Sequence, residues 1–392
     1  AACGEAPEGI NATDPGSEYA MSISASTALQ TTITARPVDP NITGDAKFKF
    51  KCNKGKCIYK CRLNSETFAT CKSPKTYTGL LPGSYIFKVK AKDPATLLWD
   101  KTPASYTWVI DKSEASFLAN AHKIASGHAH TCALNYAGAL KCWGWNTYGQ
   151  LGNGTINTTN LPVNVSGLSS GVVAVTAGHF HTCALNSLAA VKCWGDNSLG
   201  QLGNGTAVDI RKVPVNVSGL SSGVIAISAG ENHNCALTSS GGVKCWGKND
   251  YGQLGDGNTA DYFLNVPVDV LGLSSGVSAI ACGGGFSCAL TSSGGVKCWG
   301  FNGYGDLGNG DTTYTDVHFP VDVVGLSSGV VAISAGGDHA CALNDSGGLK
   351  CWGWNPVGQL GDGNTIYQNP VPVNVSGLSS GMAAISAGWA HT

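Results

Sequence analysis

Ten cysteines stand in five pairs, and within each pair the two cysteines are ten residues apart. A Cys-Ala-Leu triplet supplies the first cysteine and a Cys-Trp-Gly triplet the second. In a hairpin centred near Ser240, Cys235 faces Cys245, and directly opposed residues are close enough for a disulfide. The spacing therefore predicts five disulfides within hairpins: Cys132–Cys142, Cys183–Cys193, Cys235–Cys245, Cys288–Cys298 and Cys341–Cys351.

Two other arrangements of these cysteines stay open. The pairs could remain buried thiols, or they could bind zinc, whose structural sites take four ligands. Zinc is disfavoured because no second close pair of cysteines completes four ligands within a unit. A further cysteine, Cys282, replaces the small residue seen at Ala177, Ala229 and Ala335, so we expect it to be a buried free thiol.

The segments around each pair recur along the chain, and the first cysteines are spaced 51, 52, 53 and 53 residues apart. Each unit holds short apolar runs bounded by glycine, serine and asparagine, a pattern typical of strands and turns. Three or four short strands in a unit of about 50 residues are typical of a propeller blade. The sequence thus predicts an all-β fold in which residues 122–392 form a propeller of five full repeats and the start of a sixth.

Histidine recurs two residues before the first cysteine of these units. A ring of histidines could bind a metal ion. The fourth unit, however, has Phe286 at this position, which favours a packing role over a metal site. The histidines are His130, His181, His233, His339 and, at the start of the sixth unit, His391.

The remaining motifs do not indicate catalysis. Glycine-rich loops such as residues 252–257 superficially resemble phosphate-binding loops, but they lack the following Lys-Ser/Thr and a helix N-terminus. The sequence contains no Gly-x-Ser-x-Gly elbow, no His-Glu-x-x-His motif and no paired catalytic carboxylates. We therefore predict that the protein is not an enzyme and that it uses no metal or other cofactor.

Three recurring motifs resemble the repeat of the regulator of chromosome condensation family. They are Ala-Gly-x-x-His at residues 335–339, Trp-Gly-x-Asn at 246–249 and Gly-Gln-Leu-Gly-x-Gly at 252–257, and the resemblance extends from about Lys123 to the C-terminus. It implies a β-propeller, commonly seven-bladed. The eukaryotic founder exchanges nucleotide on a small nuclear GTPase, and some bacterial relatives inhibit β-lactamases. The paired cysteines disfavour the exchange-factor role and are typical of a secreted bacterial version.

Other loop positions vary from unit to unit and are rich in aromatic residues. A rigid framework that varies its loops is how many binding proteins present a surface, and aromatic side chains often anchor such interfaces. The alternative is drift on exposed turns, with aromatic packing between blades. The candidates for a binding face are Trp145, Tyr148, Phe180, Lys248, Tyr251, Phe301, Tyr304 and Trp354.

Residues 31–111 form a separate domain. Runs at residues 47–51 and 85–90 alternate polar and apolar side chains between turn signals, which predicts a small β-sandwich. The segments at 61–64, 68–74, 79–80 and 102–111 resemble immunoglobulin-like or fibronectin type III-like modules of bacterial surface proteins. That resemblance implies a Cys61–Cys71 disulfide, and Cys52 and Cys57 would then pair across a tight turn. A metal site formed by these four cysteines is the competing interpretation, disfavoured because no histidine lies among them.

The N-terminal segment, residues 1–30, shows little pattern, so we expect a flexible lead-in or tether, and residues 112–121 are expected to link the two domains. Ala1-Ala2-Cys3-Gly4 resembles the junction of a bacterial lipoprotein signal, in which Cys3 would carry lipid. A cysteine that is free or disulfide-bonded is the alternative. The sixth unit could complete a blade in this molecule or in a neighbour.

Composition limits the class of protein. Charged residues make up 12% of the 392 residues, against about 25% in ordinary globular chains, and the net charge is −1. This balance does not favour nucleic acid or an anionic membrane as partner. The 16 cysteines indicate an oxidising compartment. We expect an extracellular or cell-surface protein that binds a protein or glycan without catalysis; a structural subunit of an extracellular filament or surface layer is the alternative.

Overall fold

The computed structural model describes residues 28–37, 39, 44–81, 83–110, 121–207, 210–258, 260 and 262–392. All regular elements of these residues are strands, and no helix among them is long and apolar enough to span a membrane. The chain divides into two compact units, Ala1–Ala115 and Ser116–Thr392. Residues 1–27, with Cys3, and all of the expected linker except Ala121 lie outside the described residues, so the predictions for them stay predictions.

The first unit contains two antiparallel sheets. Its strands are β1 (Thr31–Ala35), β2 (Ala46–Cys52), β3 (Ile58–Leu63), β4 (Ala69–Cys71), β5 (Lys75–Tyr77), β6 (Gly83–Lys92) and β7 (Ala104–Ile110). The sheet orders are β1-β2-β5 and β4-β3-β6-β7. Phe48 of β2 stacks on Phe87 of β6 with 4.1 Å between ring centroids, so both sheets contribute to one core. Disulfides join Cys52 to Cys57 and Cys61 to Cys71.

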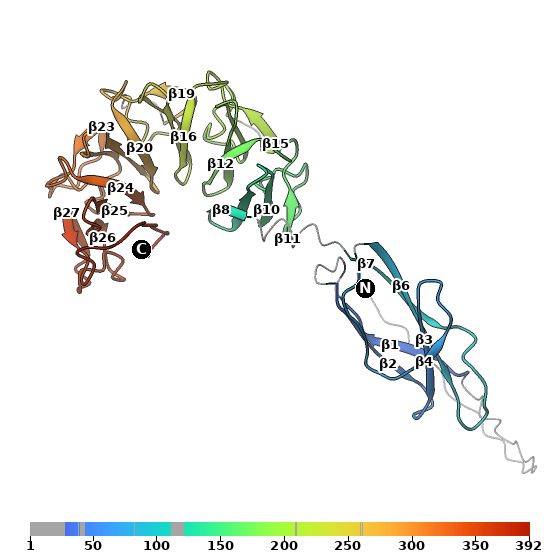
Figure 1. The fold of residues 1–392 in the computed structure, drawn as a ribbon. Coiled ribbons are helices and arrows are strands. Elements are labelled where there is room, and N and C mark those ends of the chain that lie inside the picture. The colour runs from blue at the N-terminus through green and yellow to red at the C-terminus, as the bar shows by residue number, and fades with distance from the viewer. Residues whose placement is uncertain are drawn as a thin grey trace, which may run out of the picture. The chain divides into compact units, whose positions relative to one another are not determined.

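The second unit contains five blades, each a four-stranded antiparallel sheet whose strands pair in chain order, and the blades follow one another in an arc (Figure 1). Blade 1 is β8 (Ala121–Ser126), β9 (His130–Asn135), β10 (Leu140–Gly144) and β11 (Thr159–Asn164). Blade 2 is β12 (Val172–Ala177), β13 (His181–Asn186), β14 (Val191–Gly195) and β15 (Arg211–Asn216). Blade 3 is β16 (Val224–Ala229), β17 (His233–Thr238), β18 (Val243–Lys248) and β19 (Phe263–Asp269). Blade 4 is β20 (Val277–Cys282), β21 (Phe286–Thr291), β22 (Val296–Gly300) and β23 (Val317–Asp322), and blade 5 is β24 (Val330–Ala335), β25 (His339–Asn344), β26 (Leu349–Trp354) and β27 (Gln368–Asn374).

The central hairpin of every blade has the register expected from the sequence. In blade 3, Cys235 lies opposite Cys245 and Leu237 lies opposite Val243. Each blade has one disulfide between these two strands, with Cα atoms 4.0–4.1 Å apart, the separation that suits a directly opposed pair. The pairs are Cys132–Cys142, Cys183–Cys193, Cys235–Cys245, Cys288–Cys298 and Cys341–Cys351. Cys282 is buried and free.

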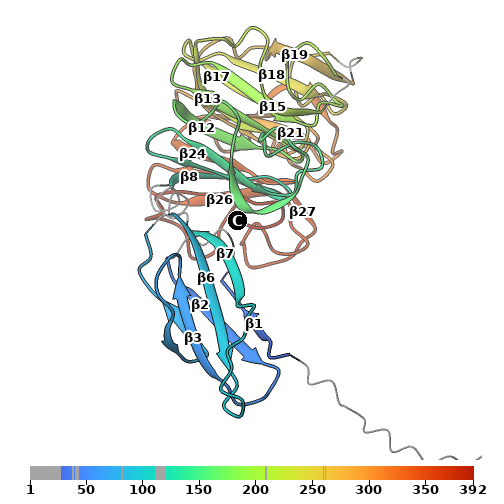
Figure 2. The same cartoon turned by 90° about the vertical axis from the view of Figure 1, so that its right-hand side faces the viewer.

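Successive blades share hydrophobic cores, and Figure 2 shows the stacked blades from the side. The core around the disulfide of blade 1 includes Ala184 and Trp194 of blade 2, and the next core includes Trp246 of blade 3 in the same way. Trp299 and Trp352 repeat the contact further along the arc. In blades 2 to 5, the tryptophan of the Cys-Trp-Gly triplet therefore anchors its blade to the preceding one. Trp143 of blade 1 is only half-buried.

Candidate binding face

Two loops of every blade emerge at the same edge of its sheet. Because the strands are antiparallel, the loop after the first strand and the loop after the third strand lie side by side. Backbone hydrogen bonds join them: the amide of Trp145 donates to the carbonyl of Ala129 at 2.8 Å, and that of Trp354 to Asp338 at 2.8 Å. We call this surface the loop face. It comprises the described residues of 127–129, 145–158, 178–180, 196–210, 230–232, 248–262, 283–285, 301–316, 336–338 and 354–367.

The aromatic residues singled out from the sequence lie on the loop face in two groups, and all are half-buried. In the first group, Phe180 of blade 2 stacks on Tyr148 of blade 1 at 4.7 Å between centroids and meets Trp145 edge-on at 5.1 Å. The second group runs across blades 3 to 5. Its successive centroid distances are 5.0 Å for Tyr251–Phe301, 5.7 Å for Phe301–Tyr304 and 6.0 Å for Tyr304–Trp354.

Lys248, the eighth predicted residue, joins the second group. Its ammonium lies 4.8 Å from the centroid of the Tyr251 ring and 2.9 Å from a carboxylate oxygen of Asp250. Burial lowers the pKa of Lys248, but Asp250, Tyr251 and Tyr262 together outweigh burial, so the pKa is raised and this lysine is charged. The structure thus brings all eight residues to one face, and their role in binding stays a prediction.

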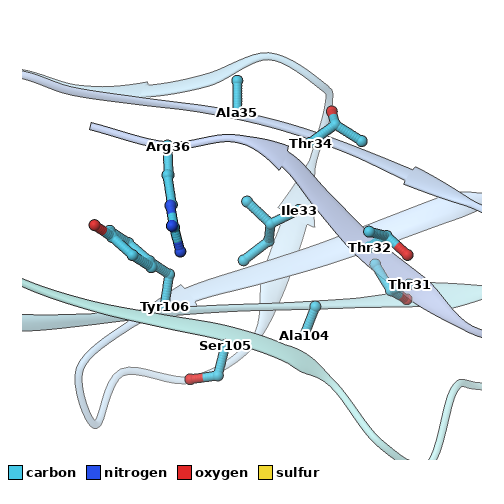
Figure 3. A pocket seen from close by; sticks show the side chains of 9 residues that line it. All are labelled: Thr31, Thr32, Ile33, Thr34, Ala35, Arg36, Ala104, Ser105 and Tyr106. Atoms are coloured by element: carbon cyan, nitrogen blue, oxygen red, sulfur yellow. The ribbon is translucent and has the colours of Figure 1, made fainter. Parts of the chain in front are cut away.

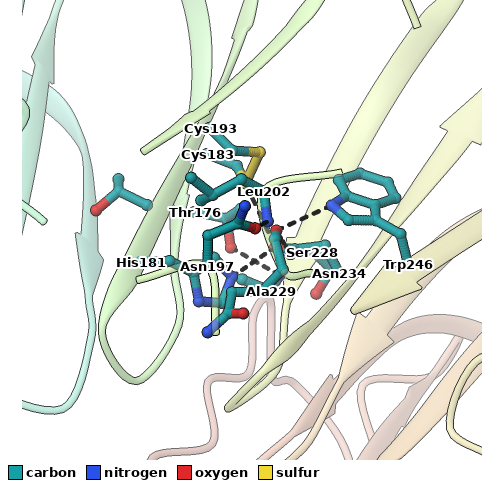
Figure 4. The surroundings of a disulfide bond; sticks show 12 residues. Thr176, His181, Cys183, Cys193, Asn197, Leu202, Ser228, Ala229, Asn234 and Trp246 are labelled. Carbon is teal, nitrogen blue, oxygen red and sulfur yellow. Dashed lines mark hydrogen bonds between the residues drawn. A yellow bond between two sulfur atoms is a disulfide. The ribbon is translucent and has the colours of Figure 1, made fainter. Parts of the chain in front are cut away.

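Beneath the loop face, a histidine of one blade contacts the next blade. Figure 4 shows the arrangement beside the Cys183–Cys193 disulfide. Nε2 of His181 lies 2.9 Å from Oδ1 of Asn234, whose Nδ2 donates to the carbonyl of Gln201. The indole of Trp246 donates to that same carbonyl at 3.0 Å. We call this chain of contacts the junction relay. It recurs as His130–Thr182, His233–Ser287 and His339–Thr392, with Nε2–oxygen distances of 2.8–3.0 Å.

The histidines of the junction relay donate from Nε2, and burial keeps their rings neutral. Thr182 donates its hydroxyl hydrogen to the carbonyl of Gln150, so Nε2 of His130 must carry the hydrogen of the contact between them. In a neutral ring Nδ1 then carries no hydrogen. In the described structure Nδ1 of the four histidines has no hydrogen-bond partner. Burial lowers the pKa of His130, His181 and His339 to about 4 and that of His233 to about 3.

The junction between blades 4 and 5 departs from this pattern at both ends of the contact. Phe286 stands where the other blades have histidine, and Ala340 stands where they have Thr182, Asn234 and Ser287. Both side chains are buried. Donor and acceptor are therefore replaced together by an apolar pair, which leaves neither half of the hydrogen bond unsatisfied.

Three carboxyl groups in loop-face segments, those of Glu231, Asp306 and Asp338, have raised pKa values. Asp306 is fully buried and takes the position that glutamine holds in the other blades. Burial, and then the neighbouring Asp338, raise the pKa of Asp306 well above its usual value. Burial also raises the pKa of Asp338. For Glu231, burial and then Asp338 raise the pKa, while Lys248 and His128 oppose the change.

The first strands of the blades surround a cavity of about 750 Å³. Most of its lining is glycine, alanine and serine, and its polar and aromatic side chains include those of His128, His179, Glu231, Trp389 and His391. The rings of His128 and His179 lie 4.2 Å apart between centroids. No sequence pattern indicated this cavity. A second cavity, of about 370 Å³, lies in the first unit, where Arg36 covers the ring of Tyr106 (Figure 3).

One cluster among the described residues has the donor types of a metal site, namely His233, Cys235 and Cys282, whose ligand atoms lie within 4.8 Å of one another. Cys235 is bonded to Cys245, and Nε2 of His233 contacts Ser287. Burial raises the pKa of Cys282 to about 11, so its thiol stays protonated. The set therefore offers no thiolate ligand in the oxidised protein.

Residues 94–392 match the family model described as the RCC1-like domain. The chain belongs to the RCC1-like domain family. In this member, the histidines of the family motif belong to the junction relay. The glycine-rich loops of the motif belong to the loop face.

Several curated RCC1-like relatives are plant and animal proteins. The chain is 33% identical over 279 residues to the ultraviolet-B receptor UVR8 of Arabidopsis thaliana, which covers 69% of this chain and 62% of that protein. It is 33% identical over 276 residues to the human E3 ubiquitin-protein ligase HERC2, covering 69% of this chain and 6% of the ligase. The chain thus spans less than two thirds of these relatives.

Two solved structures share the fold. Human WBSCR16 aligns with a TM-score of 0.62 at 20% identity, over 85% of this chain and 97% of that one. Prp20p of Saccharomyces cerevisiae aligns with a TM-score of 0.61 at 22% identity, over 79% of each chain. The latter structure is described together with the binding of Prp20p to Gsp1p and histones.

Proposed function

We propose that the protein is a non-catalytic binding protein whose loop face engages a protein partner. The observation that carries this proposal is the two groups of half-buried aromatic side chains on one face, one across blades 1 and 2 and the other across blades 3 to 5. Large aromatic side chains that already pack on each other lose little conformational freedom on binding, so they make good interface anchors. The protein binding described for the yeast relative Prp20p supports a role of this kind, not the same partners.

We further propose an extracellular or cell-surface setting. Seven disulfides among the described residues favour an oxidising compartment, because cytosolic thiols are kept reduced. The same observation weighs against a nuclear exchange factor. In this setting the first unit would serve as an immunoglobulin-like spacer of a secreted bacterial protein. A glycan is the alternative ligand for the loop face.

The test compares capture by the two ends of the blades. Wild type, a Trp145→Ser/Trp354→Ser variant and a Tyr136→Ser/Leu188→Ser control are immobilised at equal density. Tyr136 and Leu188 are 79% and 76% exposed and lie in hairpin turns at the opposite edge of blades 1 and 2. Each surface is offered extracellular proteins from the source organism, and bound proteins are quantified by mass spectrometry.

We expect one or more proteins to be retained by wild type and by the control and to be lost from the loop-face variant. Equal retention by all three surfaces would overturn the proposal. Circular dichroism and melting of each variant, measured beforehand, separate loss of binding from loss of fold. A glycan array with the same three proteins tests the alternative ligand.

A further inference from the structure

The positive charges of the chain are concentrated in its first unit. Residues 31–111 contain 14 lysine and arginine residues but only six aspartate and glutamate residues, although the whole chain has a net charge of −1. A surface with an excess of one sign of charge attracts ligands of the opposite sign. The place where the cations of this unit gather therefore indicates what it could bind.

Five of these cations lie on the outer face of the β4-β3-β6-β7 sheet, because they alternate along β3 and β6 with residues of the hydrophobic core. The register places like charges directly opposite each other: Lys60 faces Lys90, and Arg62 faces Lys88. Such pairs are unfavourable unless another group compensates their charge. We call this surface the basic face; its residues are Lys60, Arg62, Lys88, Lys90 and Lys92.

No carboxylate among the described residues forms an ion pair with the basic face. Its five side chains are nevertheless half-buried. Taking charges partly out of water without a partner of opposite sign is costly. An anionic ligand would supply the missing counter-charges.

Two half-buried aromatic rings hold these cations in place. The centroid of the Phe68 ring lies 4.9 Å from Cζ of Arg62 and 4.6 Å from Nζ of Lys90. Three ammonium groups lie within 6.0 Å of the centroid of the Trp99 ring, namely those of Lys60, Lys90 and Lys92. Because the rings attract the cations and restrict their long side chains, a ligand that binds them orders little that is not already ordered.

The cations form two short rows rather than a single pocket. Successive lysines of β6 are two residues apart, which is about 6.7 Å along a strand, and the cations of β3 lie about 5 Å across from them. A small anion can reach only one or two of these groups. A linear polymer with an anionic group on each repeating unit can contact several at once, and linked contacts reinforce one another.

The aromatic rings also bear on the class of polyanion. Proteins that bind single-stranded nucleic acids stack bases on the faces of aromatic side chains. The rings of Phe68 and Trp99 are half-buried, and cations already lie over them, so they are poor platforms for bases. Acidic polysaccharides are the linear polyanions that fit the extracellular setting proposed above.

We propose that the basic face binds a linear acidic polysaccharide through its carboxylate or sulfate groups. The lysines and Arg62 contact successive anionic groups of the polymer, and Phe68 and Trp99 keep these cations in position. The choice of a polysaccharide rests on the proposed extracellular setting. The site itself lies in the first unit and does not involve the loop face.

The test measures binding to the full chain by isothermal titration calorimetry at two salt concentrations. The ligands carry equal numbers of charges: an oligogalacturonate presents carboxylates, and a sulfated dextran oligomer presents sulfates. Neutral dextran of similar length, a single-stranded oligonucleotide of equal charge and vesicles containing phosphatidylglycerol are the comparisons. We expect saturable binding of one or both acidic oligosaccharides that weakens as salt screens the charges, and no binding of neutral dextran.

Two double substitutions remove the same charge from the two sheets. Lys60→Gln/Lys90→Gln should weaken binding of the acidic oligosaccharide about tenfold, the equivalent of about 1.4 kcal/mol. Lys49→Gln/Lys51→Gln is the matched control, because both lysines are exposed on β2 of the other sheet, and it should leave the affinity unchanged. Trp99→Leu keeps every charge and should weaken binding about threefold by releasing the lysines. Circular dichroism and melting of each variant show that the fold is retained.

Three results would overturn the proposal. One is the absence of binding by either acidic oligosaccharide. Another is equal weakening by the two double substitutions, because binding would then depend on total charge and not on the basic face. The third is tighter binding of the oligonucleotide or the vesicles than of both oligosaccharides, which would assign the basic face to that class of partner. None of these results bears on capture by the loop face, which is measured separately.

Discussion

At three of the four junctions between complete blades, a neutral histidine donates one hydrogen bond to the next blade, and His339 repeats the contact to Thr392. Because burial holds the pKa of His130, His181 and His339 near 4 and that of His233 near 3, these side chains stay neutral well below the pH at which an exposed histidine charges. In the unfolded chain their pKa values return to about 6.5. The protein's stability is thereby coupled to pH.

The sign of this coupling follows from proton uptake. Below about pH 6.5 the histidines of the unfolded chain bind protons, whereas the buried histidines of the folded protein stay neutral. The free energy of unfolding therefore falls as pH falls from about 6.5 to 4, by up to about 1.4 kcal/mol per pH unit for each histidine.

A double substitution that removes one histidine contact tests this coupling. His233→Phe/Ser287→Ala, which copies Phe286 and Ala340, should make the loss of stability with falling pH less steep. Buried carboxylates such as Asp306 act in the opposite direction but are common to both proteins. Urea unfolding of both between pH 4.5 and 7.5 measures the difference, and parallel profiles would contradict it.

The sequence identified the histidine position but not its role. The substitution by Phe286 favoured a packing role, and the hydrogen bond was missed because its acceptor lies 52–54 residues away in the next repeat. An alignment of the repeats contains the signal. Blade 4, which has phenylalanine at the histidine position, is followed by blade 5, which has Ala340 at the position of the hydrogen-bond acceptor. Oδ1 of Asp306 is buried and has no hydrogen-bond partner among the described residues, and no sequence pattern reveals this, because only coordinates show which atoms lack partners.

At the scale of the element, the glycine-rich loops are shaped by the tryptophan of the following blade. Gly203 has φ +62°, and a Cβ there would lie 2.7 Å from Cδ1 of Trp246 and 2.9 Å from Cγ1 of Val217. The indole cannot swing away without breaking its hydrogen bond to Gln201. The glycine is thus required by a close approach as well as by its backbone conformation.

Two alanine substitutions separate these requirements. Gly219 has φ +72° and nothing within 4 Å of an added Cβ, so Gly219→Ala should cost only the backbone strain of about 1–2 kcal/mol. Gly203→Ala should cost about 1–3 kcal/mol more, since the methyl group collides with Trp246. The free energy of unfolding in urea measures both. Equal losses would show that the indole yields and that packing does not fix this loop.

The register of the hairpins was the structural feature that the sequence predicted best. Side chains alternate between the two faces of a strand, the centre of each turn is known, and the paired cysteines are ten residues apart. Only one register places every cysteine opposite its partner, as Cys235 and Cys245 show. The gathering of Tyr251, Phe301 and Tyr304 followed from their equivalent positions in the repeat. Their order along one row depends on how blades are rotated against each other, and no local pattern encodes that rotation.

At the scale of the whole molecule, the chain consists of two units with separate cores. Phe48, Phe87 and Trp108 belong to the core of the first unit, and the cores of the second lie between blades. Units with their own cores unfold independently unless a large apolar interface couples them. We therefore expect the calorimetric trace of the full chain to equal the sum of the traces of residues 1–115 and 116–392. A midpoint that moves by several degrees when the other unit is removed would refute independence.

The junction relay also bears on how the number of repeats can change in evolution. Losing blade 2 in frame would bring His130 against Asn234, and a duplication of blade 2 would bring His181 against Thr182; both are donor–acceptor pairs of the kind already used. Losing blade 4 alone would bring His233 against Ala340, leaving a buried donor unsatisfied. We therefore expect copy number to change more readily among the first three blades, and blades 4 and 5 to be inherited as a linked pair.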